Sequence, residues 1–223
     1  MVASREEAAA AADRVPGSSL SARLYDPFLW IAERTGFRRW RQRIVGQVSG
    51  SVLELGAGTG LNLEHYPSGL DRLVLVEPDV HKAKLLAAKA DRLGVDAEIV
   101  RAPGEMLPFD DESFDTVIET LVLCTVADPE ATAAEIRRVL KPDGKFLFME
   151  HVRSEKPKLG KLQDRLEKPW MKIADGCHCN RRTVPMLKAN GFDVDVTAAQ
   201  DKFPMPPVAR PIVSGIGRVA PAG

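Results

Sequence analysis

The fold is decided by the stretch Val52-Leu53-Glu54-Leu55-Gly56-Ala57-Gly58-Thr59-Gly60, an apolar run that ends in three glycines at alternate positions. The apolar run predicts a buried strand, and the glycines predict a turn whose backbone can adopt positive φ and lie close to a ligand. A strand followed by such a turn and a helix opens a doubly wound α/β sheet, which binds ligands at the carboxyl ends of its strands. The expected cofactor-binding residues of this stretch are Glu54, Gly56, Ala57, Gly58, Thr59 and Gly60.

The glycine spacing distinguishes between cofactors. The dinucleotide fingerprint G-x-G-x-x-G needs glycine or alanine where this chain has Leu61, and the stretch lacks the P-loop pattern G-x-x-x-x-G-K-[ST]. The sequence E-L-G-x-G-T-G instead resembles motif I of the class I S-adenosylmethionine-dependent methyltransferases. The resemblance implies S-adenosyl-L-methionine as the cofactor and S-adenosyl-L-homocysteine as the product.

Composition narrows the class of protein. The chain has 223 residues, of which 44% are hydrophobic, and this suffices for one medium α/β domain. Lys+Arg and Asp+Glu both number 31, so the basic excess typical of nucleic-acid binding is missing. The first twenty residues contain no apolar segment typical of a signal peptide, and three cysteines make no disulfide framework. We expect a cytoplasmic protein with a small-molecule acceptor, no nucleic-acid partner and no membrane span.

The amino-terminal region divides into a tail and a lid. Residues 1–20 are rich in alanine and end in breaker residues, which predicts a disordered tail. Residues 21–48 carry apolar side chains at helical spacing, which predicts two helices at the start of a single methyltransferase domain over 21–223. Such helices commonly cover the cofactor in methyltransferases, so Tyr25 and Trp30 are substrate-binding candidates. The alternative is that these aromatic residues only pack against the sheet.

The second strand supplies a ribose-binding candidate. A helix expected from Leu61 to Tyr66 would direct its amino terminus, with Asn62, at the cofactor carboxylate. The apolar run 72–76 then predicts a buried strand that ends in Glu77 and Pro78. An acid at this position accepts hydrogen bonds from ribose hydroxyls in nucleotide-binding α/β folds, and a helix-capping or solvated glutamate is the alternative.

The loop after the third strand is expected to pass over the adenine. Residues 97–100 predict that strand, and the following loop contains Leu-Pro-Phe, as many related enzymes do. Pro103 stands where those enzymes have an aspartate that binds the adenine amino group. We therefore assign adenine binding to the neighbouring residues Gly104, Glu105 and Met106.

The fourth and fifth strands are expected to end at the acceptor. Residues 114–119 predict the fourth strand, followed by cofactor-binding Thr120 and Leu121 and by Cys124, which is either a substrate-binding residue or a small buried hydrophobe. The fifth strand is expected to end in Glu150 and His151, our candidate catalytic residues. An imidazole can take a proton from an acceptor, whereas the alternative is a structural hydrogen-bonding pair.

An insertion at residues 153–180 occupies the usual place of a substrate-selecting segment. It contains an amphipathic helical pattern that we expect Pro169 to break. Cys177, His178 and Cys179 lie within three residues, but their spacing differs from C-x-x-C, and further metal ligands would have to come from His151, Cys124 or elsewhere. We predict no metal. The substrate-binding candidates of this segment are Trp170, Asp175 and Cys177.

The remaining elements complete a seven-stranded mixed sheet. We expect a helix over 181–189, a sixth strand over 192–199 and an antiparallel seventh strand within 208–219. The predicted fold is thus a Rossmann-like α/β methyltransferase fold with amino-terminal lid helices. The sequence makes no prediction of the oligomeric state.

Later motifs favour one group within the class. The segments 120–124 and 149–152, and Trp170 with 175–177, resemble the methyltransferase-like 7 group of thiol S-methyltransferases and its bacterial relatives. The resemblance implies methyl transfer to a thiolate. The alternatives are an N- or C-methyltransferase acting on an amine lipid or quinone precursor, and a protein that binds S-adenosylmethionine without catalysis.

Overall fold

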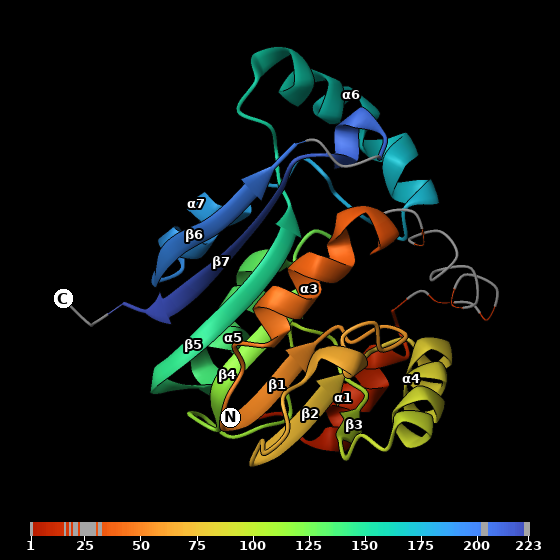
Figure 1. Ribbon diagram of the computed structural model, residues 1–223, viewed down its shortest axis with the longest axis vertical. Helices are drawn as coiled ribbons and strands as arrows, with labels where there is room; N and C mark the ends of the chain where they lie inside the picture. The colour runs from red at the N-terminus through yellow and green to blue at the C-terminus, as the bar shows by residue number, and fades with distance from the viewer. Residues whose placement is uncertain are drawn as a thin grey trace.

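The computed structural model describes residues 2–15, 17, 19, 22, 30, 33–201 and 205–220. Seven strands form one mixed sheet in the order β3-β2-β1-β4-β5-β7-β6, and β7 is antiparallel to both of its neighbours (Figure 1). This confirms the predicted seven-stranded sheet. The strands are β1 Ser51–Leu55, β2 Arg72–Val76, β3 Glu98–Val100, β4 Phe114–Thr120, β5 Leu140–His151, β6 Phe192–Gln200 and β7 Ile212–Val219.

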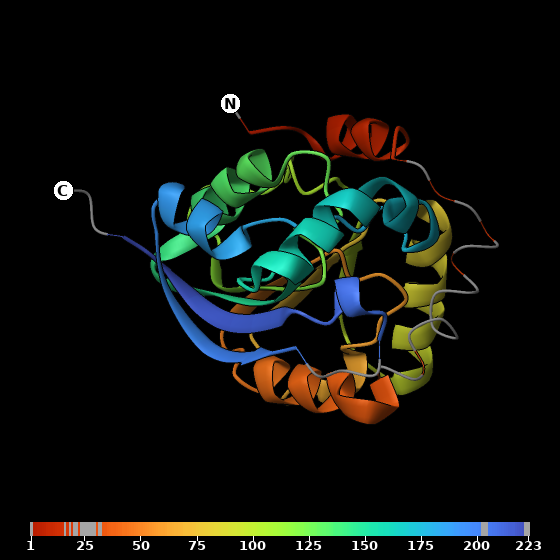
Figure 2. The ribbon, with the colours of Figure 1, turned by 90° about the horizontal axis from the view of Figure 1, so that it is seen from above.

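Helices cover both faces of the sheet. Figure 2 shows α3 on one side and α1, α5 and α7 on the other, while Figure 1 shows α6 beyond the carboxyl end of β5. Among the described residues, no helix is long and apolar enough to cross a membrane. The helices are α1 Arg5–Ala12, α3 Arg38–Val45, α4 Val80–Leu93, α5 Pro129–Val139, α6 Pro157–Ile173 and α7 Thr183–Ala189, with the short turns η1 Glu33–Phe37, η2 Leu63–His65 and η3 Pro207–Ala209.

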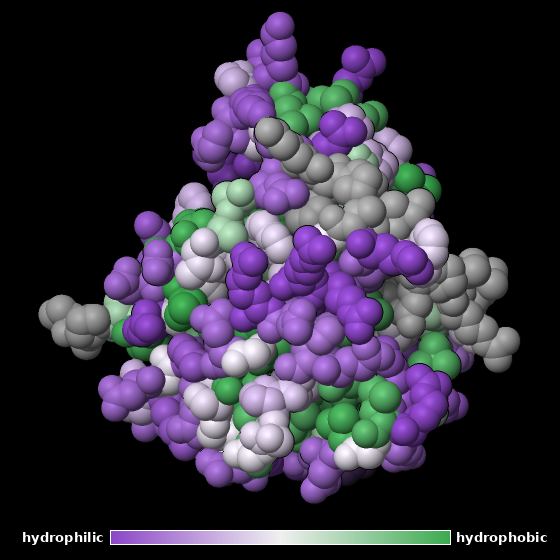
Figure 3. Space-filling view, viewed as in Figure 1, coloured by the Kyte–Doolittle hydropathy of each residue, from purple (hydrophilic) through white to green (hydrophobic). Residues whose placement is uncertain are grey.

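Alternation along the strands divides the core into two clusters. On β5, Leu147 and Met149 pack with Ile44 of α3, whereas Phe146 and Phe148 pack on the opposite face with residues of α5 and α7. Side chains on a strand point alternately to the two faces of the sheet. The surface of α3 is hydrophilic, as the band across the middle of Figure 3 shows. Because side chains alternate along β5, any functional residue on this strand whose side chain points the same way as that of Met149 lies on the face covered by α3.

The prediction that residues 1–20 form a disordered tail is wrong for the residues of α1. Ser4 caps this helix: its hydroxyl accepts a hydrogen bond from the backbone N–H of Glu7, and the Glu7 carboxylate accepts one from the Ser4 N–H. Such a capping box satisfies amides that a helix start leaves unpaired. Ala8 and Ala12 are buried, and Ala8 belongs to the core cluster on the α5 face. A small, alanine-rich face thus packs here, although its composition suggested a free tail.

Two helix predictions also need correction. The first crossover helix, expected from Leu61 to Tyr66, is only the single turn η2, because Tyr66 is extended and precedes Pro67, and a residue before proline disfavours helical backbone. In contrast, α6 continues through Pro169, where we expected a break. Burial of Gln163 and Trp170 on the same helix offsets the missing hydrogen bond.

Several boundaries agree with the sequence. Asp79 caps α4 by accepting hydrogen bonds from the N–H groups of His81 and Lys82, and Gly94 ends the helix with φ of 65°. In the lid region, α3 follows a kink at Gly36, as predicted for the second lid helix. The first lid helix and Tyr25 lie outside the described residues.

Candidate active site

A polar network joins the carboxyl ends of β1 and β4 on the α3 face. The Asn62 amide donates hydrogen bonds to Glu54 Oε1 at 2.7 Å and to Thr120 Oγ1 at 3.1 Å, and the Tyr66 hydroxyl donates to Glu54 Oε2. Glu54, Asn62 and Thr120 are all buried. The structure thus brings together three predicted cofactor residues from separate segments.

Arg41 of α3 completes this network, and the sequence analysis missed it. Its guanidinium donates to Thr120 Oγ1 at 2.6 Å, to Asn62 Oδ1 at 3.2 Å and to Glu33 Oε1 at 2.8 Å. The side chain is only 2% exposed, although three other arginines of the same helix lie on its outer face. Its position next to Trp40, on the inward side of an amphipathic helix, is the signal that could have identified it.

Burial controls the ionisation of Glu54. It raises the pKa of this carboxyl to about 7, although the hydrogen bonds from Tyr66 and Asn62 and the charge of Arg41 lower the pKa. Desolvation outweighs these contacts because an ionised carboxylate loses more hydration than they return. The network therefore titrates near neutral pH.

Glu77 organises the glycine turn at the tip of β2. Its Oε2 accepts a hydrogen bond from the N–H of Gly58 at 2.8 Å, and its Oε1 accepts one from the N–H of Asp79 at 2.9 Å. Burial raises the pKa of Glu77, and Lys82 and these backbone amides oppose that shift. Each carboxylate oxygen has two acceptor sites. Glu77 can thus hold the turn and still accept hydrogen bonds from a ribose.

The turn itself requires glycine. Gly56, Gly58 and Gly60 have φ of 61°, 58° and 81°. A Cβ on Gly56 would lie 2.5 Å from a methyl of Val122, so any other side chain would push β1 away from the loop after β4. Leu121 in that loop has φ of 66°, an uncommon conformation for a branched residue that is typical of functional sites. The backbone at the strand tips thus allows a ligand to approach it closely.

The residues of the loop predicted to bind adenine lie in different surroundings. Glu105 Oε1 accepts a hydrogen bond from the N–H of Asp128 at 2.9 Å, so its carboxylate faces the start of α5. Met106 is 37% exposed, whereas Gly104 packs against Thr132 so closely that a Cβ would lie 2.9 Å from it. The Pro78 carbonyl accepts a hydrogen bond from Arg101. The residues of this loop do not converge as the strand-tip network does.

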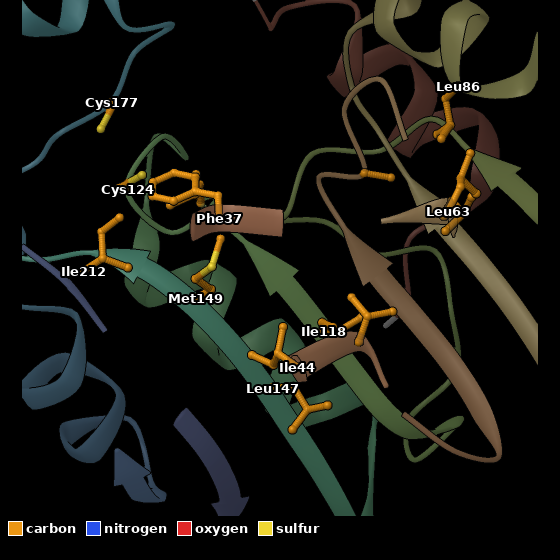
Figure 4. Close-up of a cluster of buried hydrophobic side chains, with 14 of the residues drawn as sticks. Phe37, Ile44, Leu63, Leu86, Ile118, Cys124, Leu147, Met149, Cys177 and Ile212 are labelled. Atoms are coloured by element: carbon orange, nitrogen blue, oxygen red, sulfur yellow. The ribbon is translucent and has the colours of Figure 1, made fainter. Parts of the chain in front are cut away.

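A buried chamber of sulfur and imidazole lies at the tips of β4 and β5. His151 Nδ1 is 3.5 Å from Cys177 Sγ and 3.9 Å from Cys124 Sγ, and all three residues are buried. Figure 4 shows Cys124 and Cys177 approaching from two different loops beside Phe37 and Met149. The ring of Phe37 lies 6.4 Å from that of His151. Residues distant in the sequence therefore form one reactive group, which we call the chamber.

The side chains of the chamber shift one another's pKa values. The hydrogen bond from Cys124 and the neighbouring imidazole hold the pKa of Cys177 well below its ordinary value, against the effect of burial. The hydrogen bond to Cys177 and burial raise the pKa of Cys124 well above its ordinary value. Burial lowers the pKa of His151, but Cys177 more than offsets it, so the net pKa is raised. The lowered pKa of Cys177 and the raised pKa of His151 share one cause, because each side chain stabilises the charged form of the other.

Glu150 does not join His151 in the chamber. Its carboxylate accepts a hydrogen bond from the N–H of Cys124 at 3.1 Å and lies near that of Glu119, which accepts a hydrogen bond from the N–H of Val122. Burial raises the pKa of both glutamates. Strand alternation places Glu150 on the face opposite His151. Glu150 thus holds the loop that carries Cys124, and its catalytic role stays a prediction.

Other substrate candidates have mixed positions. Trp170 of α6 is buried in the cluster that contains Cys177, whereas Trp30 is 56% exposed with the Arg34 guanidinium over its ring. The Asp175 carboxylate forms an ion pair with Lys82 of α4. The structure therefore brings Trp170 to the chamber and leaves Trp30 outside it.

The compact Cys177-His178-Cys179 motif is split by the fold. His178 Nδ1 lies 2.8 Å from a Glu167 oxygen, and Cys179 is buried in the core without joining the chamber. Only Cys177 faces His151. Its partner thiol comes from Cys124, more than fifty residues earlier.

Comparisons with known proteins define the class. Residues 53–148 match the family model described as a methyltransferase domain. A solved structure described as a SAM-dependent methyltransferase, possible histamine N-methyltransferase, from Thermotoga maritima superposes with a TM-score of 0.68 at 20% identity, covering 90% of this chain and 98% of that one. The chain has the fold of the class I S-adenosylmethionine-dependent methyltransferases, and the matched domain together with this fold implies S-adenosyl-L-methionine as cofactor.

Proteins found by sequence similarity share a higher identity with this chain than the solved structure does. The chain is 39% identical over 137 residues to thiol S-methyltransferase TMT1B of Rattus norvegicus, an alignment that covers 60% of this chain and 56% of the relative. It is 38% identical over 118 residues to a demethylmenaquinone methyltransferase of Renibacterium salmoninarum, covering 51% of this chain and 48% of the relative. The chain thus spans about half the length of the curated relatives that it matches.

Proposed function

We propose that the chain transfers a methyl group from S-adenosyl-L-methionine to the sulfur of a small thiol. The observation that carries this proposal is the chamber, in which an imidazole and two thiols lie buried at the ends of β4 and β5, with Cys124 in the same loop as the strained Leu121. The similarity to thiol S-methyltransferases supports the same acceptor class.

The strand-tip residues suit this cofactor. Glu77 offers carboxylate oxygens to the ribose, and the turn from Gly56 to Gly60 offers its backbone to the methionine part. Arg41, with Asn62 and Thr120, places a buried cation and polar groups at the tips of β1 and β4, where the carboxylate of the methionine part needs partners. When bound, the cofactor supplies a methyl group on a positively charged sulfonium.

His151 acts on the acceptor proton in this proposal. A thiolate is far more nucleophilic than a thiol, so an acceptor needs its proton removed before it attacks carbon. Nε2 of His151 is buried and has no hydrogen-bond partner among the described residues, which leaves it available to the acceptor. Phe37 and Trp170 are buried in the same apolar cluster as Cys124 and Cys177, and such surroundings disfavour water and side reactions during methyl transfer.

A second candidate function is methylation of a quinone precursor or amine, as favoured by the similarity to a demethylmenaquinone methyltransferase. A matched panel separates the two: thiophenol, aniline and phenol differ only in the acceptor atom. Release of S-adenosylhomocysteine is measured for each compound. We expect turnover with thiophenol alone, and preferential turnover with aniline or phenol would contradict a thiol acceptor.

The role of His151 has its own test. We expect His151→Ala to lower kcat/KM for a thiol at least ~100-fold, as for loss of a general base, and to remove the pH dependence caused by the imidazole. The matched variant Glu150→Gln keeps an acceptor for the Cys124 amide, and we expect it to retain the pH dependence with only a small shift to lower pH, because the Glu150 charge contributes to the raised pKa of His151. An unaltered profile in His151→Ala would remove His151 from this role.

A further inference from the structure

The chamber has the donor set of a metal site. The two thiols and the imidazole offer ligand atoms that all lie within 4.8 Å of one another. Their two sulfur–nitrogen separations are 3.5 and 3.9 Å. A tetrahedral zinc ion with Zn–S bonds of about 2.3 Å and a Zn–N bond of about 2.0 Å places sulfur and nitrogen roughly 3.5 Å apart. Small side-chain movements would therefore suffice to close the three ligands on zinc.

We propose that Cys124, His151 and Cys177 bind one zinc ion and that the acceptor thiol takes the fourth coordination position. Catalytic zinc sites typically use three protein ligands and keep one position open. The identity of the fourth ligand rests on the proposed function, whereas the three protein ligands do not. This inference goes against our sequence prediction of no metal, which considered the wrong triplet.

The ligands are held in place by the backbone around them. Cys124 donates its N–H to Glu150 and accepts a hydrogen bond at its carbonyl from the N–H of His178 at 2.7 Å. Cys177 N–H donates to the Ala174 carbonyl at 3.0 Å. His151 is the last residue of β5 and pairs with Ile212 of β7. The three donors thus come from a rigid framework rather than from free loops.

The same framework ties α6 to the chamber. The Gln163 amide donates hydrogen bonds to the carbonyls of Val152, Cys179 and Val208, and its oxygen accepts one from the Ser154 N–H. Gln163 is fully buried. The segment that carries Cys177 is therefore fastened to the end of β5, which preorganises the site for an ion.

Zinc would give the chamber the chemistry that a thiol acceptor needs. In the zinc-bound form the ion takes over the role proposed for His151, whose Nδ1 is then a ligand: the acceptor thiol binds the ion as a thiolate, and its proton leaves to solvent. A lone pair of that sulfur attacks the methyl carbon, forming a carbon–sulfur bond while the bond from this carbon to the cofactor sulfur breaks and leaves its electron pair on that sulfur. Two cysteine thiolates balance the charge of the ion, so the bound acceptor stays nucleophilic. The product is a neutral thioether, a weaker ligand that dissociates.

Zinc content and cobalt spectroscopy test the site directly. The full chain is purified under reducing conditions, its zinc is measured by mass spectrometry, and the metal-free protein is titrated with Co²⁺. We expect about one equivalent of zinc and the intense visible bands of tetrahedral Co²⁺ with thiolate ligands. Addition of thiophenol in the absence of cofactor should shift those bands, whereas phenol should not.

A matched pair of variants identifies the ligands. Cys177→Ala removes a proposed ligand, and Cys179→Ala changes a buried cysteine two residues away that lies outside the chamber. We expect the first to lower zinc affinity at least ~100-fold and the second to leave it unchanged. Binding of S-adenosylhomocysteine by calorimetry checks that both variants are folded.

The outcomes separate this inference from the proposed function. Protein without zinc and without cobalt bands, or equal zinc affinity in the two variants, would overturn the metal site. Cobalt bands that ignore every thiol would overturn the acceptor as fourth ligand. Bands that shift with thiophenol but without release of S-adenosylhomocysteine when cofactor is added would support the zinc inference and refute the proposed function.

Discussion

The proposed cofactor half and the proposed acceptor half of the site lie at the same edge of the sheet but are assembled differently. The cofactor half uses residues close in sequence, with Glu54 and the glycine turn on one strand-loop unit and Glu77 at the next strand tip. The acceptor half takes Cys124, His151 and Cys177 from three separate segments. The comparison teaches that the proposed cofactor half can be predicted from local sequence patterns, whereas the proposed acceptor half depends on tertiary contacts. Four variants probe this comparison.

The largest expected effect belongs to Glu77 in the cofactor half. In Glu77→Ala, the amides of Gly58 and Asp79 lose their acceptor and the ribose loses its partner. Because several hydrogen bonds are lost together, we expect affinity for S-adenosylhomocysteine to fall at least ~100-fold in calorimetry. Glu98→Ala, on the surface of β3, is the matched control. Unchanged affinity in Glu77→Ala would refute the ribose assignment.

The next largest effect is expected at Glu54 and concerns the free energy of unfolding. Its pKa is about 7 in the folded chain against an ordinary value of 4.5. The folded state therefore binds the proton more tightly, and stability falls as pH rises from about 4.5 to about 7, by on the order of 3 kcal/mol. Glu54→Gln cannot ionise, so its stability relative to the wild type should increase across this range.

Urea denaturation at several pH values measures this difference. Comparing the variant with the wild type at each pH cancels the titration of the other buried glutamates to first order. A stability difference that stays constant between pH 5 and pH 8 would show that Glu54 ionises normally and that the network is more hydrated than the structure indicates.

Arg41 links the lid side of the molecule to the cofactor half. Arg41→Lys keeps the charge but loses the planar fork that reaches Asn62 and Thr120 together. We expect S-adenosylhomocysteine affinity to fall about 10-fold, which is roughly 1.4 kcal/mol. Arg43→Lys on the exposed face of α3 should have no effect. Equal affinities of the two variants would exclude Arg41 from the cofactor site.

Asp175 is expected to give the smallest effect. Its ion pair with Lys82 connects α4, in the cofactor half, to the segment that carries Cys177, but its side chain is 43% exposed. Exposed ion pairs contribute at most about 1 kcal/mol. Asp175→Asn should therefore lower stability by less than about 1 kcal/mol in denaturant titration and leave KM for a thiol within about 3-fold. A larger rise in KM would restore Asp175 as a substrate-binding residue.

The sequence predicted the sheet well and named residues of the proposed cofactor half that the structure brings together. Apolar runs and breakers located all seven strands, and Glu54, Asn62 and Thr120 proved to share one hydrogen-bonded network. Arg41 was not predicted as a site residue because the helical pattern shows which face of the helix points inward but not which polar group that face contacts. The tail prediction failed because alanine-rich composition does not reveal the buried side of α1.

The acceptor half was predicted as candidates rather than as an arrangement. Cys124, His151 and Cys177 were each named as candidates, but the adjacent Cys177-His178-Cys179 was taken as the centre of any metal site, with His151 and Cys124 only as further ligands. Glu150 was grouped with His151 because the two are neighbours in sequence. Strand alternation sends them to opposite faces, so adjacency along a strand is a poor guide to a shared site.

The central claim, methyl transfer to sulfur, is tested most directly by one competition within a single molecule. Cysteamine carries a thiol and an amine, and S-adenosylmethionine with a deuterated methyl group marks the transferred carbon. Mass spectrometry of the product locates the label on sulfur or nitrogen. Our account predicts the label on sulfur alone. A label on nitrogen would contradict it.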